Sequence, residues 1–379
     1  MPRTAKRTRI EAGAIPAEAL GHEFPRLKLP IVPPYPPVEA KSVEQIPDSP
    51  GWLYEPKWDG FRCLAFRDGD EVVLQSKAGQ PLGRYFPELV DALAQLPARK
   101  FVLDGEIVIS RNGHLDFDAL LQRIHPAASR IQKLSRATPA TYVVFDLLVA
   151  ERSRLLTVET LSRRRMELQE FAKRNLPRKT KTIQLSPATT DARVAKRWLQ
   201  QGATSGLDGV IAKRLDCEYR SGERDGMVKV KRIRTADCVV GGFRWAQKGG
   251  KVGSLLLGLY NDEDKLDHVG FCSSFSHEER KKLKRILKPL VGGEGFTGKA
   301  PGGPSRWTTP DRNTEWIPLK PSLVCEVRYD HFSGGRFRHG TKFLRWRPEK
   351  DPRECTFDQV LPKKIRRDMD FEELTPIVA

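Results

Sequence analysis

Residues 55–62 (EPKWDGFR) bring a lysine, two carboxylates, a glycine and an arginine together within eight consecutive positions. Apolar residues flank this octet on both sides, which predicts two short strands with a connection between them. Gly60 allows the connection to turn or to approach a ligand closely. Lys57, next to Asp59 and near Arg62, is therefore a candidate for phosphate binding or covalent catalysis. The simpler interpretation is a solvated turn with a surface ion pair.

Two apolar runs further along the chain contain acidic residues. The run at 101–109 (FVLDGEIVI) includes Asp104 and Glu106, and the run at 141–149 (TYVVFDLLV) includes Asp146. A carboxylate that is buried without a partner costs on the order of several kcal/mol. These acids are therefore expected to face a polar cleft or a cationic partner, and ion pairs that serve only the structure are the alternative.

Two later segments carry cations on predicted strands. In GLDGVIAKR, Asp208 precedes a short strand and Lys213 lies at its end. In MVKVKR, apolar and basic residues alternate, so that Lys229 and Lys231 share one face of a strand. Two neighbouring ammonium groups repel unless an anion lies near them. A phosphate site is the sharper interpretation, and a solvated strand face is the other.

The composition favours a partner with many negative charges. The 379 residues include 66 Lys and Arg against 48 Asp and Glu, a formal net charge of +18. Such an excess indicates nucleic acid, while a membrane surface is disfavoured because the sequence has no long apolar run. The six cysteines form no Cys-x-x-Cys pair, and no signal-peptide pattern is present. Both observations favour a reducing cytoplasm.

The length and the pattern changes predict an α+β protein of two domains. We expect a tail and extended lead-in at 1–45, a first domain at 46–234, a second at 235–355 and a tail at 356–379. In the first domain the pattern predicts strands at 71–74, 101–109, 141–149 and 209–212 and helices at 87–96 and 161–173.

The second domain has the pattern of a small β-barrel of the OB type. Its expected strands are 238–245, 253–260, 266–272, 323–329 and 336–346, with a helix after the capping box at Ser276 and a hairpin turn at 333–335. The last stretch is rich in cations, namely Arg336, Arg338, Lys342, Arg345, Arg347 and Lys350. We expect this group to contact phosphate.

The ordered set of motifs resembles a known family. The motifs are Lys-x-Asp-Gly-x-Arg at 57–62, Asp-Gly-Glu at 104–106, Phe-Asp at 145–146, Asp-Gly-Val-Ile-Ala-Lys at 208–213, Lys-Val-Lys at 229–231 and Arg-Pro-Glu-Lys at 347–350. Together they closely resemble the covalent nucleotidyltransferases, specifically the ATP-dependent DNA ligases. The small stand-alone bacterial ligases of the C type are the most similar.

The resemblance implies an adenylation domain followed by an OB-fold domain, and a three-step reaction with ATP and Mg²⁺ or Mn²⁺. Lys57 would attack the α-phosphate of ATP and form a lysyl–AMP. AMP would then pass to the 5′-phosphate of a nick in duplex DNA, and the 3′-hydroxyl would displace AMP, in the service of DNA repair. The lysine must be uncharged to attack, so burial, neighbouring cations or the metal are expected to lower its pKa.

The resemblance also assigns roles to single residues. Lys57 and Asp59 would be catalytic, and Asp208 and Glu106 would hold the metal. Glu106 would also bind the ribose, and Phe145 would stack on adenine. Arg347 and Lys350 would orient pyrophosphate. The remaining nucleotide-binding or phosphate-binding residues would be Glu55, Arg62, Lys77, Lys213, Lys229 and Lys231.

The sequence departs from the family's pattern at four positions. Asp208 stands where glutamate is usual, and Lys77 where arginine is usual, which removes a bidentate phosphate contact. Glu349 replaces the usual aspartate and Met227 the usual tryptophan. Two alternative functions stay open: RNA sealing or capping by a related nucleotidyltransferase, and DNA binding by a relative without catalytic activity. The expected state is a monomer.

Overall fold

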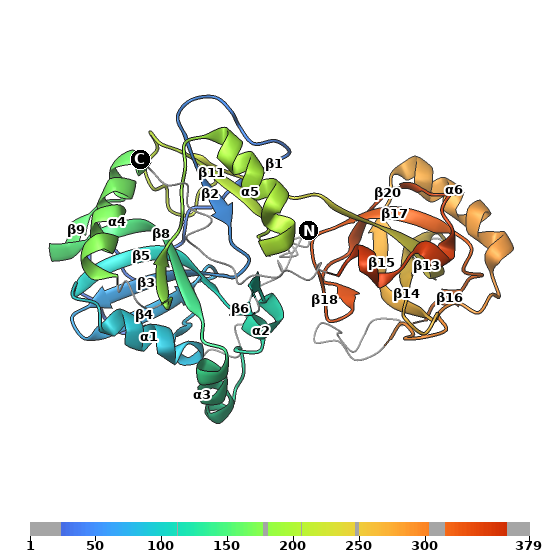
Figure 1. Ribbon diagram of the computed structural model, residues 1–379, viewed down its shortest axis with the longest axis horizontal. Coiled ribbons are helices and arrows are strands. Elements are labelled where there is room, and N and C mark those ends of the chain that lie inside the picture. The colour runs from blue at the N-terminus through green and yellow to red at the C-terminus, as the bar shows by residue number, and fades with distance from the viewer. Residues whose placement is uncertain are drawn as a thin grey trace, which may run out of the picture. The chain divides into compact units, whose positions relative to one another are not determined.

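The computed structural model describes residues 24–111, 113–176, 181–205, 207–246, 250–302 and 315–361. The chain divides into two compact units, and the second unit begins at Ile233 (Figure 1). The predicted boundary at 234–235 lies within two residues of this point. None of the described helices is long and apolar enough to cross a membrane.

The first sheet of unit 1 has four strands within the described residues, in the order β1-β12-β11-β2. Their bounds are Lys41–Val43 (β1), Met227–Lys231 (β12), Gly209–Arg214 (β11) and Trp52–Lys57 (β2). Helix α5 (Ala192–Ser205) covers one face, where Trp198 packs with Tyr54 and Val210. The other face carries the charged side chains of Glu55, Lys57, Lys213, Lys229 and Lys231, together with the apolar Leu53, Ile211 and Met227.

The second sheet of unit 1 has the order β10-β8-β5-β3-β4, and β9 pairs with β8. The bounds are Ile183–Leu185 (β10), Thr141–Ala150 (β8), Lys100–Val108 (β5), Phe61–Asp68 (β3), Glu71–Ser76 (β4) and Arg154–Leu155 (β9). Helices α1 (Pro87–Ala94) and α4 (Leu161–Asn175) contribute Leu89, Leu93 and Leu168 to the core on one face of this sheet. The side chain of Thr160 caps the start of α4 by accepting a hydrogen bond from Arg163 N.

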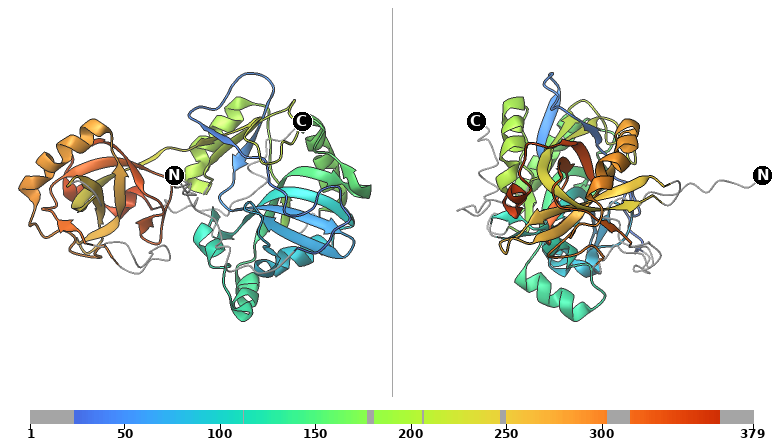
Figure 2. Two further views of the ribbon diagram at one scale, coloured as in Figure 1. Left: turned by 180° about the vertical axis from the view of Figure 1, so that it is seen from behind. Right: turned by 90° about the vertical axis from the view of Figure 1, so that its right-hand side faces the viewer.

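Shorter elements complete unit 1, and Figure 2 shows both sheets from behind. They are β6 (Ser110–Arg111), β7 (His114–Leu115), α2 (Phe117–Leu121) and α3 (Ala128–Ala137). The predicted strands and helices of this unit are all present, with ends that differ by a few residues.

The described part of the predicted lead-in packs against unit 1. Leu27, Ile31 and Val38 contact the apolar cluster that includes Leu64 and Phe66 on β3. The backbone of Tyr35 exchanges two hydrogen bonds of 2.8 Å with the buried side chain of Gln75, and β1 pairs in parallel with β12. The proline-rich segment therefore belongs to the domain because side chains satisfy its backbone. Residues 1–23 of the predicted tail lie outside the described residues.

Unit 2 is a closed barrel, because its five main strands pair in a ring, β13-β14-β15-β20-β17 and back to β13 (Figures 1 and 2). The bounds are Arg234–Trp245 (β13), Val252–Tyr260 (β14), Leu266–Ser274 (β15), Ile317–Pro318 (β16), Val324–Tyr329 (β17), Phe332–Ser333 (β18), Arg336–Phe337 (β19) and Thr341–Trp346 (β20). Helix α6 (His277–Leu287) begins with the predicted capping box of Ser276 and Glu279. The ring confirms the OB-type barrel.

The structure corrects two details of unit 2. The strand predicted at 336–346 is two strands, of which β19 forms a hairpin with β18 around Gly334 and Gly335. Both glycines have positive φ angles, as the predicted tight turn requires. Val360 is buried and the Gln359 side chain contacts Asp237, so unit 2 continues beyond the predicted end at 355.

Candidate active site

The site is built on the face of the first sheet that α5 does not cover. The strand register places Gly209 of β11 directly between Lys57 of β2 and Lys231 of β12. Two residues along, Ile211 lies in the same way between Glu55 and Lys229. Because residues two apart in a strand share a face, the three lysines and Glu55 lie on one surface. The predicted common face of Lys229 and Lys231 is thereby extended to Lys57.

A glycine at position 209 allows the two neighbouring strands to approach. Its φ angle is +153°, and an added Cβ would lie 2.1 Å from the carbonyl oxygen of Val230. Any larger residue would push β11 away from β12 in the row of residues that contains Lys57 and Lys231. Gly209 therefore sets the separation between two cationic side chains.

Lys57 is mostly buried and lies against a carboxylate. Its Nζ is 2.5 Å from Asp208 Oδ2, and 19% of its side chain is exposed. Burial acts to lower the pKa of Lys57, but Asp208, followed by Asp59 and Glu106, outweighs it and holds the pKa above its usual value. In the protein alone the amine is thus a stabilised ammonium, whereas the sequence led us to expect a lowered pKa.

Asp208 joins two of the lysines. It lies 3.5 Å from Lys231 Nζ in addition to its contact with Lys57, and it is 4% exposed. Its backbone N–H donates a hydrogen bond to the carbonyl oxygen of Lys57. This arrangement fixes the carboxylate beside the amine of Lys57, so the residue predicted as a metal ligand is at the centre of the site.

Glu106 faces the same cluster from the second sheet. It lies opposite Arg62 in the register of β3 and β5. Burial raises the pKa of Glu106 to about 7, although Arg62 and Lys57 act to lower it. The carboxyl group therefore changes its protonation close to neutral pH, where an approaching cation would favour the charged form.

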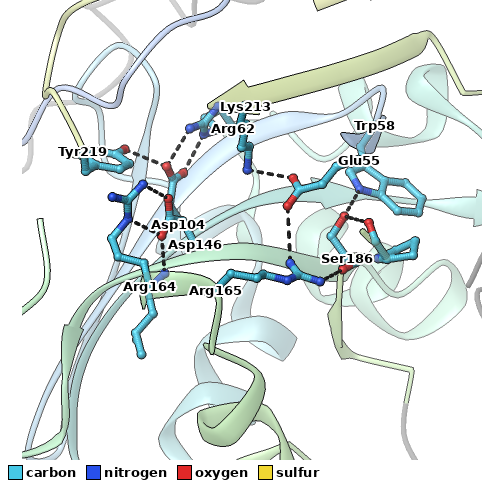
Figure 3. A network of polar contacts seen from close by, with 12 residues as sticks. Glu55, Trp58, Arg62, Asp104, Asp146, Arg164, Arg165, Ser186, Lys213 and Tyr219 are labelled. Atoms are coloured by element: carbon cyan, nitrogen blue, oxygen red, sulfur yellow. Dashed lines mark hydrogen bonds and ion pairs between the residues drawn. The ribbon is translucent and has the colours of Figure 1, made fainter. Parts of the chain in front are cut away.

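Arg62 is held by a buried carboxylate. Its Nε and Nη2 atoms each donate a 2.6 Å hydrogen bond to Asp104, which is fully buried (Figure 3). The guanidinium lies 4.6 Å from the centre of the Phe145 ring. Asp104 is therefore one of the paired acids that the apolar strand predicts, and its partner is the arginine of the first motif.

Glu55 and Lys213 form a second buried pair. Lys213 Nζ is 2.7 Å from Glu55 Oε2, and Glu55 is 2% exposed. The same ammonium lies 4.4 Å from the centre of the Phe145 ring. Phe145 thus contacts both Arg62 and Lys213, two cations that come from different sheets.

Helix α4 supplies two arginines to the network. Arg164 makes a bidentate pair with Asp146 at 2.9 and 3.0 Å. Arg165 contacts Glu55 at 3.4 Å and donates a 2.6 Å hydrogen bond to Ser186 O, while the Ser186 hydroxyl accepts from Trp58 (Figure 3). These contacts support the residues on both sides of Lys57.

Sequence reasoning missed Arg164, Arg165, Ser186 and Tyr219. A signal for the two arginines was present, because they lie three and four residues after Leu161 and share its buried helical face. Tyr219 lies in the connection between β11 and β12, where no periodic pattern distinguishes it.

A small cavity opens between the two sheets beside this network. It is lined by Arg62, Phe145, Lys213, Met227 and Tyr219, among others. The cavity places aromatic, apolar and cationic groups together, a combination that suits a base attached to a phosphate.

Lys77 and the two cations of unit 2 that the resemblance assigns to pyrophosphate have acidic partners of their own. Lys77 Nζ is 3.1 Å from Glu39, which also pairs with Arg224 at 2.8 Å. In unit 2, Arg347 pairs with Asp237 at 2.9 Å, and Lys350 pairs with Glu354. The sequence did not indicate the ion pair of Lys77 with Glu39.

The carboxylates of the site fit a magnesium ion only as partial ligands. No group of three or more His, Cys, Asp or Glu in the described part of the chain is arranged to hold a metal. Mg²⁺ is commonly bound by one or two carboxylates with the remaining ligands from phosphate and water. Asp208 and Glu106 match that chemistry.

Comparison with known proteins gives a consistent result. Residues 37–231 match the family described as "ATP dependent DNA ligase domain", and residues 248–350 match "ATP dependent DNA ligase C terminal region". DNA ligase C1 of Mycolicibacterium smegmatis is 47% identical over 344 residues, which are 88% of this chain and 96% of that protein. DNA ligase C of Mycobacterium tuberculosis is 44% identical over 348 residues, with the same coverage of 88% and 96%.

A solved structure named "Pmar-Lig_Pre." shares the fold, with a TM-score of 0.56 and 17% identity over 83% of this chain and 68% of that one. The two family matches, and a lysine-bearing sheet followed by an OB barrel, agree with the covalent nucleotidyltransferases, the class that the motifs resemble. Within that class, the chain belongs to the family of ATP-dependent DNA ligases.

Proposed function

We propose that this chain seals nicks between a 5′-phosphate and a 3′-hydroxyl in duplex DNA, through an AMP carried on Lys57, and that it serves DNA repair. The observation that carries the proposal is the row formed by Lys57, Gly209 and Lys231, with Asp208 2.5 Å from the lysine nitrogen. The names of the similar mycobacterial ligases and the family match support the choice of DNA and ATP.

The first step forms a bond between Lys57 Nζ and the α-phosphorus of ATP while the bond to the β-phosphate oxygen breaks. Pyrophosphate leaves with the electron pair of that bond. The ammonium of Lys57 must lose a proton beforehand, because its lone pair is the nucleophile. In the protein alone Asp208 stabilises the protonated form of this amine, so weakening the ion pair between the two residues lets the proton pass to solvent and prepares the amine.

The carboxylates of Asp208 and Glu106 would hold Mg²⁺ or Mn²⁺. Such an ion would supply positive charge beside the α-phosphate and would compete with the Lys57 ammonium for Asp208. Lys229 and Lys231 add further positive charge on the same face, where charge develops on the transferred phosphate.

The nucleotide is proposed to lie between the two sheets. Phe145 offers an aromatic surface for adenine, and Glu106 offers a carboxylate for the ribose hydroxyls. Glu55 and Lys213 border this surface as a buried pair. Arg62 is aimed by Asp104 and is assigned to the nucleotide or to the nick phosphate.

The remaining steps transfer AMP from Lys57 to the 5′-phosphate of the nick, and the 3′-hydroxyl then displaces AMP. Asp59 assists at the lysine, Lys77 is assigned to the nucleotide or the nick phosphate, and Arg347 and Lys350 to pyrophosphate. The net charge of +18 supplies affinity for the DNA backbone. We expect the protein to act as a monomer in the cytoplasm, with nicked DNA as its partner.

The test is incubation of the full chain with labelled ATP or labelled GTP, with each metal in turn, followed by sealing of DNA and mixed DNA–RNA nicks. We expect label from ATP on Lys57 and sealing of DNA. The variant Lys57→Ala should lose both activities. Label from GTP alone would favour a capping enzyme, and label retained by Lys57→Ala would contradict the assignment of the nucleophile.

A further inference from the structure

A tyrosine outside all recognised motifs contacts the carboxylate that holds Arg62. The hydroxyl of Tyr219 donates a 2.7 Å hydrogen bond to Asp104 Oδ2, the same oxygen that accepts from Arg62 Nη2 (Figure 3). Tyr219 is 4% exposed and Asp104 is fully buried. The contact therefore lies in a water-poor environment, where a hydrogen bond to a charge is strong.

The direction of the hydroxyl proton is fixed by a second contact. The backbone N–H of Val38 donates to the Tyr219 oxygen at 3.2 Å, which occupies an acceptor position of the hydroxyl. The O–H bond is thus left to point at Asp104. Val38 lies in the lead-in, so this segment takes part in orienting a side chain of the site.

The ring of Tyr219 is held from several sides. Its backbone N–H donates to Thr157 O at 2.9 Å, and its ring stacks on Tyr35 with centres 6.5 Å apart. The guanidinium of Arg164 lies 5.6 Å from its centre. The hydroxyl accordingly has one available position, and the carboxylate of Asp104 is constrained by it.

Rotation of the Asp104 carboxylate would move both oxygens that Arg62 grips. The guanidinium of Arg62 grips both oxygens at 2.6 Å, a bidentate pairing that is best when the carboxylate lies in the plane of the guanidinium. Arg62 in turn lies against Phe145, the proposed adenine surface. Loss of the hydrogen bond from Tyr219 would allow the Asp104 carboxylate to rotate, and the Arg62 guanidinium would rotate with it.

We propose that Tyr219 is a positioning residue of the ligase reaction: it fixes the Asp104 carboxylate and thereby the plane in which Arg62 meets the phosphate. This inference rests on the proposed function. Tyr219 acts on the orientation of the planar guanidinium group, so its effect on the reaction requires an arginine at position 62.

The experiment compares Tyr219→Phe with the unmodified full chain in two single-turnover reactions, formation of lysyl–AMP from labelled ATP and sealing of a nick that already carries AMP. Arg62→Lys shows which of the two reactions depends more on Arg62. We expect Tyr219→Phe to slow that reaction by about tenfold, which is at the lower end of the effect of losing a hydrogen bond to a charged group. In the Arg62→Lys background, Tyr219→Phe should change that rate less than about twofold, because an ammonium has no plane to maintain.

Tyr142→Phe is the matched control. It removes another buried tyrosine hydroxyl of unit 1, which donates to the carbonyl oxygens of Cys63 and Leu103 and not to Asp104. We expect Tyr142→Phe to lower the melting temperature but to leave the rates of both single-turnover reactions unchanged. If Tyr219→Phe is folded by circular dichroism but retains the full rates, or if its loss persists in the Arg62→Lys background, the inference is wrong.

The two proposals fail in different ways. If the unmodified chain forms no lysyl–AMP, the proposed function is wrong. If it forms lysyl–AMP and seals nicks while Tyr219→Phe does so equally well, only the role of Tyr219 is wrong.

Discussion

Gly209→Ala is predicted to damage the active site and the first sheet together. Gly209 lies between Lys57 and Lys231 in the strand register, with a φ angle of +153°. The new Cβ would lie 2.1 Å from Val230 O and 3.0 Å from Lys231 Cα. Both are backbone atoms, so no side-chain rotation can relieve the clash.

The size of the effect follows from the displacement that is needed. Ordinary contact begins at 3.4 Å, so β11 and β12 must separate by 1.3 Å from the 2.1 Å approach at this point. The unfavourable φ angle costs about 1–3 kcal/mol, and loosened hydrogen bonds at the strand end add about 1 kcal/mol. We expect a loss of about 3 kcal/mol in the free energy of unfolding of unit 1. A displacement of about 1 Å at a catalytic group lowers its rate by about a hundredfold.

The measurements are urea unfolding of the full chain, hydrogen exchange of residues 52–57 to locate the change, and single-turnover formation of lysyl–AMP. Gly69→Ala is the control, because Gly69 is also in unit 1 with a positive φ of +68°, and the nearest atom to its added Cβ is a side-chain tip at 4.0 Å. It should lose about 1 kcal/mol of stability and no rate. A Gly209→Ala protein within about 0.5 kcal/mol of the unmodified chain, with an unchanged rate, would refute this account of the lysine row.

Three further outcomes are expected. Asp208→Asn removes the largest of the charges that raise the pKa of Lys57, so that burial, which lowers it, is opposed only by Asp59 and Glu106. Modification of Lys57 by an amine reagent at pH 8, read by mass spectrometry, should become faster, and slower modification would contradict the ion pair. The pKa of Glu106 is about 7 in the folded chain and 4.5 in the unfolded chain. Between pH 4.5 and 7, Glu106 therefore holds a proton in the folded state that it has lost in the unfolded state. Stability should therefore fall as the pH rises from 4.5 to 7, and Glu106→Gln should flatten this dependence in pH-dependent urea unfolding; an identical slope in both proteins would count against the buried carboxyl. Because the net charge is +18, binding to a nicked duplex should weaken about a thousandfold between about 50 and 200 mM salt in a fluorescence anisotropy titration, and near-constant affinity would argue against electrostatic binding.

The sequence predicted those features that depend on local pattern. Period-two alternation placed Lys229 and Lys231 on one face, and the capping box of Ser276 and the glycine pair of the hairpin marked a helix start and a turn correctly. These signals involve residues close together in the chain, so propensity and periodicity are sufficient to find them.

Contacts between distant segments were not predictable in the same way. The pairing of β1 with β12 joins residues 41–43 to residues 228–230, and no local pattern specifies a partner so far away. The partners of the buried acids were missed for the same reason, since the pattern predicts that Asp104 needs a cation without saying which one. The ordered motifs indicated Lys57, Asp208 and Lys231, which the structure brings together. The ammonium state of Lys57 depends on its distance from the Asp208 carboxylate, which only the folded chain defines.

The lysines of the candidate active site are spaced by the main chain and not by the packing of side chains. Neighbouring strands are about 4.8 Å apart because their peptide groups are hydrogen-bonded, whatever residues they carry. The apolar residues behind the sheet, such as Val210 and Trp198, can therefore change during evolution without altering the distance between the charges. The spacing of the candidate site's lysines is therefore expected to tolerate substitutions in the hydrophobic core. Gly209 is the exception, because a side chain at this position would itself separate the strands.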